Sequence, residues 1–255
     1  MLLAIDIGNT NIVIGVYDGT RLLASWRIAT EVQRQTDEYA VLLRGLCELR
    51  EIALAQVRSI VLACVVPPLT ETFRTLAREY LRVEPLVVEP GIRTGVRVRV
   101  DNPREVGADR IVNALAAQQL YGTPAIVIDL GTATTFDAVS AEGDYLGGAI
   151  APGILVALEA LVGRTSRLQR IELARPKTAI GRNTVAAMQS GLLFGYVGLV
   201  EGLIDRFQQE LGGNAKVIAT GGLAHLIAAE TPKIQVLHPE LTLEGLRLIY
   251  ELNRP

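Results

Sequence analysis

The sequence predicts an α/β protein built from two similar halves, each with a mixed β-sheet flanked by helices. An apolar run leads into Asp6-Ile7-Gly8-Asn9-Thr10-Asn11, and the same shape returns at Asp129-Leu130-Gly131-Thr132, offset by 123 residues. In each half the Asp-x-Gly turn is followed by a strand, a second turn and a third strand, and helical patterns then alternate with apolar strands. A loop that recurs with its whole context indicates a duplicated domain. We expect the halves to span residues 1–120 and 121–255.

The first half reads as three strands followed by alternating helices and strands. Asp18-Gly19 is a hairpin signal between the second and third strands, and Pro67-Pro68 ends one strand and starts a helix. We expect strands at 1–5, 12–17, 21–28, 59–66 and 86–88, and helices at 37–50, capped by Thr36, and at 69–81. This order predicts a mixed sheet with helices packed on it.

Two irregular segments, 91–109 and 164–182, interrupt the regular patterns. A long irregular segment inside a compact domain is usually functional or mobile. The remaining elements are expected as strands at 125–130, 136–139, 145–151, 216–220 and 234–237, and helices at 111–121, 153–161, 184–211, 223–229 and 242–253. Glycines at three- or four-residue intervals in the long helix predict close packing against another helix: Gly191, Gly195, Gly198 and Gly202.

Composition excludes several classes of protein. A net charge of -2 gives no general attraction for nucleic acid or an anionic membrane, and the longest apolar run is too short to cross a bilayer. Only His225 and His238 are available for zinc sites or histidine-based triads. Cys47 and Cys64 lie in apolar surroundings, which indicates buried reduced thiols of a cytosolic protein. The N-terminus lacks a basic region, so we expect no signal peptide.

The chemistry is expected at the glycine turns. A glycine after a strand-end carboxylate lets the backbone approach phosphate oxygens and leaves an acid for a metal ion, although a single such turn is more often structural. Asp109, at a helix start, serves by itself to stabilise the helix dipole. Thr220-Gly221-Gly222 suits a flat ring, a phosphate or a tight turn. The sequence has no Gly-Lys dipeptide, which excludes a P-loop, and no dinucleotide-binding glycine motif.

Two Asp-x-Gly turns and a late Thr-Gly-Gly are the pattern of the actin-like ATPase and sugar kinase superfamily, whose domains are ribonuclease H-like. Within it the chain resembles type III pantothenate kinase. The resemblance is carried by Asp6–Asn11, Gly107–Arg110, Asp129–Thr135, Gly147-Gly148 with Pro152-Gly153, and Thr220–Gly222. It implies ATP-dependent phosphorylation of pantothenate to 4'-phosphopantothenate, the first step of coenzyme A biosynthesis. It also implies a nucleotide cleft between the halves, Mg²⁺, a monovalent cation (K⁺ or NH₄⁺) and a cytoplasmic homodimer.

The resemblance also assigns roles. Asp109 is the expected base for the pantothenate hydroxyl, and Asp129 the ligand of the monovalent cation. By the same resemblance Asp6 is expected near Mg²⁺, and Thr132 is expected to bind phosphate from the second loop. The first phosphate loop comprises Asp6, Ile7, Gly8, Asn9, Thr10, Asn11, Ile12 and Val13, and the adenosine is bordered by Gly221 and Gly222. Substrate contacts are expected from Gly107, Ala108, Asp109 and Arg110, and from Thr184 reaching a neighbouring subunit. The family often has a tyrosine where this chain has Val100.

The sequence leaves two alternatives to an active pantothenate kinase open. One is a catalytically inactive relative that binds nucleotide as an accessory or regulatory protein, and the other is a kinase for another small alcohol or a phosphatase of the same superfamily. The joint presence of Asp6, Asp109 and Asp129 favours a working kinase, because an inactive site has no need of all three acids.

Overall fold

A computed structural model describes residues 1–254, and the chain forms two compact units. The first unit contains residues 1–96, 101–116 and the described residues from 240 onward; the second contains 97–100 and 117–239. These units differ from the expected halves, 1–120 and 121–255, at three places, the first being the boundary itself, which lies after residue 116 and not after 120. The C-terminal helix packs with the first unit, and the short segment 97–100 packs with the second.

The first unit is a five-stranded mixed sheet in the order β3-β2-β1-β4-β5. Its strands are β1 (Leu2–Ile7), β2 (Asn11–Asp18), β3 (Arg21–Ala29), β4 (Ser59–Cys64) and β5 (Leu86–Val87). Its helices are α1 (Thr36–Glu48), α2 (Pro67–Leu76), the start of α3 (Ala108–Tyr121) and α7 (Leu241–Asn253). Strands β1, β2 and β3 are antiparallel neighbours, whereas β4 and β5 continue the sheet in parallel from β1.

The second unit repeats this topology, with the sheet order β10-β9-β6-β7-β8. Its strands are β6 (Ala125–Leu130), β7 (Ala133–Val139), β8 (Tyr145–Pro152), β9 (Lys216–Thr220) and β10 (Val236–Leu237), and its helices are α4 (Ile154–Gly163), α5 (Thr184–Glu210) and α6 (Ala224–Ala228). Strand β6 pairs antiparallel with β7 and parallel with β9, as β1 does with β2 and β4. The duplication predicted from the two Asp-x-Gly turns is confirmed.

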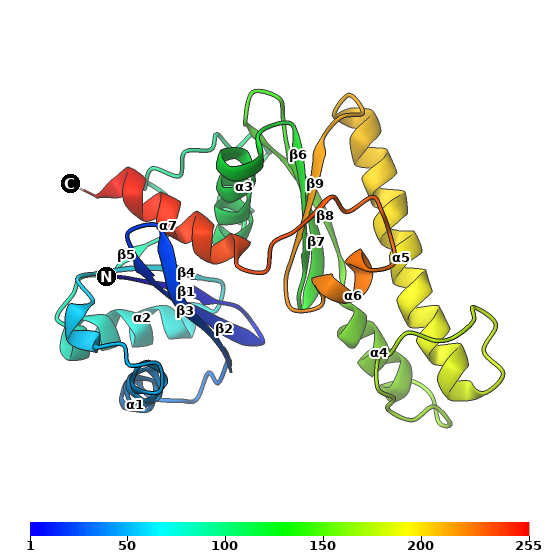
Figure 1. Ribbon diagram of the computed structural model, residues 1–255, viewed down its shortest axis with the longest axis horizontal. Coiled ribbons are helices and arrows are strands. Elements are labelled where there is room, and N and C mark those ends of the chain that lie inside the picture. The colour runs from blue at the N-terminus through cyan, green and yellow to red at the C-terminus, as the bar shows by residue number, and fades with distance from the viewer. Residues whose placement is uncertain (255) are drawn as a thin grey trace. The chain divides into compact units, whose positions relative to one another are not determined.

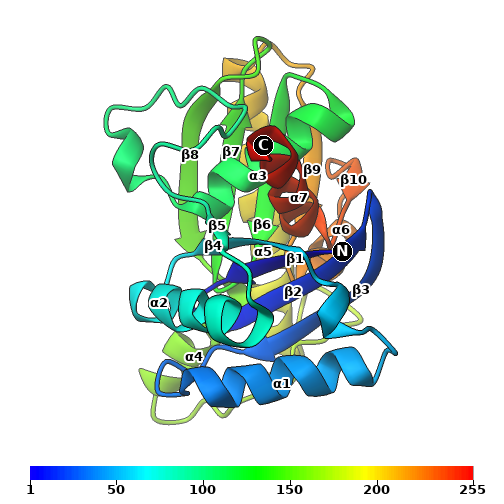
Figure 2. The same ribbon diagram turned by 90° about the vertical axis from the view of Figure 1, so that its left-hand side faces the viewer.

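Each sheet packs one face against helices of its own unit. In the first unit Leu3, Ile5 and Ile7 of β1 belong to one core cluster with residues of α1 and α2, and these two helices lie together beside the sheet in Figure 2. In the second unit the corresponding residues Ile126 and Ile128 pack in a cluster with α4, α5 and α6 (Figure 1). Side chains alternate along a strand, so Asp6 of β1 and Asp129 of β6 point to the face opposite these clusters.

Several expected boundaries needed correction. Gln35, and not Thr36, is the N-cap of α1, because its side chain and that of Glu38 form a reciprocal capping box. The helix expected over 69–81 is α-helical only to Leu76 and continues as one π-helical turn to Leu81. Cys47 is buried as expected, whereas Cys64 is only half-buried.

The glycine stripe of α5 does not pack within the chain. Apart from the backbone of α5 itself, a Cβ built at Gly191, Gly195 or Gly198 meets no atom of the described residues within 4 Å, so the predicted packing of this stripe against another helix stays a prediction. By length and composition α5 is the one described helix able to cross a membrane, a test that core helices also pass. Its Leu193, Val200 and Ile204 lie in the core of the second unit.

The contact between α7 and α3 gives a stability prediction. A Cβ at Gly245 would lie 2.6 Å from Val112 Cγ1 and 2.9 Å from its carbonyl carbon, so Gly245→Ala forces the two helices apart. We expect a loss of about 1–3 kcal/mol in the free energy of unfolding, measured by urea titration. The matched control is Gly45→Ala in α1, where a Cβ meets nothing within 4 Å. It should stabilise by about 0.5–1 kcal/mol. Equal effects of the two variants would contradict the close contact.

Candidate functional site

The turn between β1 and β2 is held closed by backbone and hydroxyl bonds. The Gly8 N–H donates to the Asn11 carbonyl at 3.0 Å, and the Thr30 hydroxyl donates to the Gly8 carbonyl at 2.6 Å. The Thr30 N–H in turn donates to Thr10 at 2.9 Å. Asn9 and Thr10 at the tip remain exposed, whereas Ile7 and Ile12 below it are buried. The turn therefore presents polar side chains on a fixed backbone, as a phosphate loop requires.

Asp6 points away from the apolar core of its sheet. Its neighbours Ile5 and Ile7 face the cluster with α1 and α2, so alternation directs the half-buried Asp6 to the other face. That face also carries Gly15, where a Cβ would lie 2.8 Å from a methyl of Leu243 in α7. A carboxylate is tolerated at this position because it lies at the strand end and outside the closely packed region.

The segment Gly107–Arg110 lies beside the end of the same strands. The Val65 N–H donates to the Ile7 carbonyl at 3.0 Å, and Val65 Cγ1 is 3.8 Å from the position of a Cβ on Gly107. The first turn of α3 follows directly, with Asp109 as its second residue. The end of β1, where the expected first phosphate loop begins, and the expected substrate segment are thus both next to Val65 in the first unit.

The Asp109 carboxylate has a defined position and an altered acidity. Its Oδ1 accepts the Arg110 N–H at 2.9 Å and occupies the space that a side chain at Gly107 would need. Burial raises the pKa of Asp109 above its ordinary value, and this effect outweighs the lowering by Arg110. A carboxylate with a raised pKa in a defined orientation is a stronger proton acceptor than an exposed one.

In the second unit the Asp129 side chain packs closely against the turn formed by Thr220, Gly221 and Gly222. Gly221 has a φ of +96°, and a Cβ on it would lie 2.5 Å from Asp129 Oδ1 and 2.7 Å from the backbone of Leu130. The Leu223 N–H donates to the Leu130 carbonyl at 3.2 Å. Only glycine meets both demands, so Gly221 brings the Thr-Gly-Gly turn onto the β6 carboxylate. Gly222 follows at the exposed side of this turn.

The turn between β6 and β7 contains Thr132 and is supported from below by Gly153. The Gly153 N–H donates to the Thr132 carbonyl at 2.9 Å, and a Cβ on Gly153 would collide with the carbonyl oxygens of Gly131 and Thr132. The start of α4 is therefore packed directly against the second turn. The contacts of Gly153 and Thr30 were not found by sequence reasoning, because no motif marks a residue that is distant in sequence and touches only backbone.

Thr184 lies elsewhere in the second unit, in a cavity of about 770 Å³ at the start of α5. Its polar end is formed by Arg182, Asn183 and Thr184, and Leu161 and Met188 belong to its apolar wall. Asn183 caps α5 by accepting the Ala186 N–H at 2.9 Å. Charged, amide and hydroxyl groups beside an apolar wall match a small amphipathic acid.

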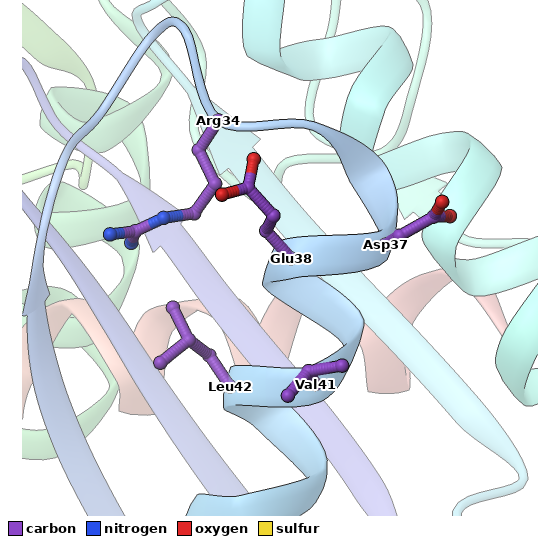
Figure 3. A pocket seen from close by; sticks show the side chains of 5 residues that line it. All are labelled: Arg34, Asp37, Glu38, Val41 and Leu42. Carbon is purple, nitrogen blue, oxygen red and sulfur yellow. The ribbon is translucent and has the colours of Figure 1, made fainter.

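A different cavity, of about 400 Å³, lies at the start of α1 and contains none of the predicted residues. Figure 3 shows Arg34 and Asp37 pointing in opposite directions, with Leu42 below them. Because its charged groups do not converge on one point, we assign it no function.

The oxygen atoms of Asp6 and Asp129 near the two turns suit hard cations whose coordination is completed by a bound phosphate and water. No group of three or more His, Cys, Asp or Glu side chains gathers among the described residues. Asp6 and Asp129 are the carboxylates at the ends of β1 and β6, and each belongs to no larger acidic group among the described residues. Such sets suit Mg²⁺ completed by phosphate and water, and a weakly held monovalent cation, but no closed structural metal site.

Comparison with known proteins gives a consistent family. A family profile described as type III pantothenate kinase matches residues 2–206. A type III pantothenate kinase of Roseiflexus sp. (strain RS-1) is 58% identical over 254 residues, covering 100% of both chains. One from Moorella thermoacetica is 54% identical over 253 residues, covering 99% of this chain and 100% of the relative.

Solved structures show the same fold at low identity. A Campylobacter jejuni protein described as a Baf family transcriptional activator matches at a TM-score of 0.63 and 20% identity, covering 98% of each chain. An activator of 2-hydroxyisocaproyl-CoA dehydratase from Clostridium difficile, with bound ADPNP, matches at 0.54 and 11% identity, covering 99% of this chain and 94% of its own. Together with an ATP-glucomannokinase from Arthrobacter sp. strain KM, matching at 0.50 and 16% identity over 99% of each chain, they confirm the predicted actin-like ATPase and sugar kinase fold.

The raised pKa of Asp109 can be measured directly. We expect its carboxyl carbon to titrate, by ¹³C NMR, above the ordinary aspartate value of 3.8, because burial disfavours the charged form. The Asp109→Asn variant identifies the resonance by removing it. If Asp109 acts as a base, turnover falls on acidification at this same raised midpoint, since protonation removes the base form. A midpoint at or below 3.8 would contradict the burial of this group.

Proposed function

The chain belongs to the type III pantothenate kinase family, and from this premise we propose how its residues divide the reaction. It is a kinase that transfers phosphate from ATP to pantothenate in coenzyme A biosynthesis. We assign Asp109 as the general base and Gly107–Arg110 as the substrate segment. The turns at Gly8 and Thr132 bind the phosphates.

The observation that carries this assignment is the place of Asp109 in the first unit. Gly107 lies beside Val65, which is hydrogen-bonded to the strand that ends in the first phosphate loop. A hydroxyl bound at Gly107–Arg110 would therefore be close to phosphate bound at that loop. The guanidinium of Arg110 is suited to a substrate carboxylate, since its planar donors match a carboxylate's two oxygens.

In the reaction Asp109 accepts the proton of the pantothenate hydroxyl while the oxygen of that hydroxyl forms a bond to the γ-phosphorus of ATP. The bond between that phosphorus and the β,γ-bridging oxygen breaks, and ADP leaves with the electron pair. Phosphoryl transfer depends mainly on positioning and charge neutralisation. Asp6 would hold Mg²⁺ and Asp129 a K⁺ or NH₄⁺ ion, which would supply positive charge to offset the phosphate oxygens.

The second unit would supply the adenosine side and the second phosphate contact. Thr132 stands on a turn that Gly153 supports through backbone, and Gly221 holds the Thr-Gly-Gly turn against Asp129. The fold neighbour solved with ADPNP supports the capacity of this architecture to hold a nucleotide. In this assignment Gly222 borders the adenosine at the exposed side of the turn.

We also propose a cytoplasmic homodimer in which Thr184 reaches the site of the partner subunit. The open glycine positions of α5 support it, because a second copy could approach Gly191, Gly195 and Gly198 closely. Only 33% of the apolar window of α5 is buried within the chain. With a net charge of -2, neither nucleic acid nor an anionic membrane is an expected partner.

Asp109→Asn tests the assignment of the base. We expect kcat for pantothenate-dependent ADP release to fall about 100- to 10,000-fold, because the amide cannot accept the proton. ATP binding, measured by calorimetry, should persist, since Asp109 contributes to the substrate side. Asp101→Asn, which removes an exposed acid from the same segment, is the matched control and should retain activity. Substantial turnover in Asp109→Asn would reduce Asp109 to a helix-stabilising residue.

Mixed dimers test the shared site. Asp109→Asn and Thr184→Val chains are mixed after separate purification and allowed to exchange subunits. If Thr184 acts in the partner's site, each hybrid has one intact site, and an equal mixture should regain about a quarter of wild-type turnover by symmetry. If Thr184 acts within its own chain, no hybrid site is intact and the mixture shows only the average of the two variants.

A further inference from the structure

The segment 97–100 adds a short edge to the sheet of the second unit. Val98 forms a parallel bridge with Tyr145 at the start of β8. The Arg99 N–H donates to the Tyr145 carbonyl, and the Tyr145 N–H donates to the Arg97 carbonyl, both at 2.8 Å. The chain then returns to the first unit and reaches Gly107 within seven residues of Val100.

One carboxylate secures this edge. Arg97 Nε and Arg99 Nε each donate to a different oxygen of Asp144, and both distances are 2.8 Å. The Asp144 side chain is only 9% exposed, whereas those of Arg97 and Arg99 are 68% and 59% exposed. Partial burial by itself raises the pKa of Asp144, but the hydrogen bonds from the two arginines outweigh it and the pKa lies below its ordinary value. Asp144 is thus held ionised between two cations.

The residue after Asp144 ties the same point to the strand of the second phosphate loop. The Tyr145 hydroxyl donates to Asp137 Oδ1 at 2.8 Å, and Asp137 is fully buried in β7. Strand β7 begins at Ala133, directly after Thr132. The backbone of Tyr145 holds segment 97–100, and its side chain holds β7. The Asp144-Tyr145 pair therefore joins the segment before the substrate residues to the strand after the phosphate turn.

From this arrangement we propose that Asp144 is a positioning residue for the pantothenate side of the reaction, acting through Arg97 and Arg99 on the segment that leads to Gly107–Arg110. The proposal rests on the assignment of Gly107–Arg110 to the substrate. Asp144 touches neither substrate nor nucleotide in this role. It reduces the freedom of the residues between Val100 and Gly107 by anchoring their first end.

Anchoring explains why two arginines meet one acid. A single exposed ion pair contributes little, because solvent screens it and the side chains lose freedom. Here the Asp144 carboxylate is mostly buried, and each of its oxygens accepts a hydrogen bond from one arginine. Removing its charge therefore weakens both hydrogen bonds together. Arg97 and Arg99 are two residues apart in the segment, so their side chains lie on the same side of it and both bind Asp144. The backbone of Val98, between them, pairs with β8.

Asp144→Asn tests the proposal through a split between kinetic constants. We expect KM for pantothenate to rise about tenfold, with KM for ATP unchanged within twofold, because a bond to a charged group is lost only on the substrate side. Hydrogen exchange should quicken in peptides covering 97–106. Glu142→Gln, which removes a carboxylate from the same hairpin turn, is the matched control and should leave both constants and the exchange rates unchanged.

Arginine variants keep the test independent of the folding of Asp144→Asn. Arg97→Met with Arg99→Met should reproduce the rise in KM for pantothenate, and adding Asp144→Asn to them should change nothing further. Additive effects, or an equal loss for both substrates with unchanged exchange in 97–106, would overturn the role of Asp144. Absence of pantothenate-dependent turnover in the wild type would instead contradict the assigned reaction, while the exchange measurement would still report on the anchor.

Discussion

The structure depends on one constraint: a carboxylate at the end of a buried strand must point away from the apolar face and find space there. Asp6 and Asp129 satisfy it in the same way, because each lies on the face opposite its helical core cluster. Asp129 Oδ1 lies in the space that a side chain on Gly221 would fill, and Asp109 Oδ1 lies in the space that a side chain on Gly107 would fill. Gly221 and Gly107 thus provide the space in which the carboxylates of Asp129 and Asp109 lie.

Duplication explains the shared architecture but not the roles. The two sheets have matching strand orders and the same pairing around β1 and β6. The first turn is tied by the Thr30 hydroxyl and leaves Asn9 and Thr10 exposed. The second is supported by Gly153 through backbone, and its acid is in contact with a late glycine turn. The two turns of the duplicated fold are therefore held by different contacts.

The path of the chain between the units matters as much as the repeated fold. Residues 97–100 leave the first unit, pair with β8 in the second and return before α3 begins. The acid proposed as the base therefore follows a segment anchored at both ends, at Asp144 before it and by the first turn of α3 after it.

By itself the sequence determined the duplication, the strand-turn-strand context of both Asp-x-Gly loops and the position of Asp109 at a helix start, because these follow from local periodicity and glycine chemistry. Tertiary structure alone decided which partners meet: Gln35 as the α1 cap, α7 with the first unit, and Thr30, Gly153 and Asp144 as supports. It also left the α5 glycines without a partner in the chain. Apart from the local Gln35 cap, these contacts join residues far apart in sequence, and neither composition nor residue spacing specifies which distant residues will meet.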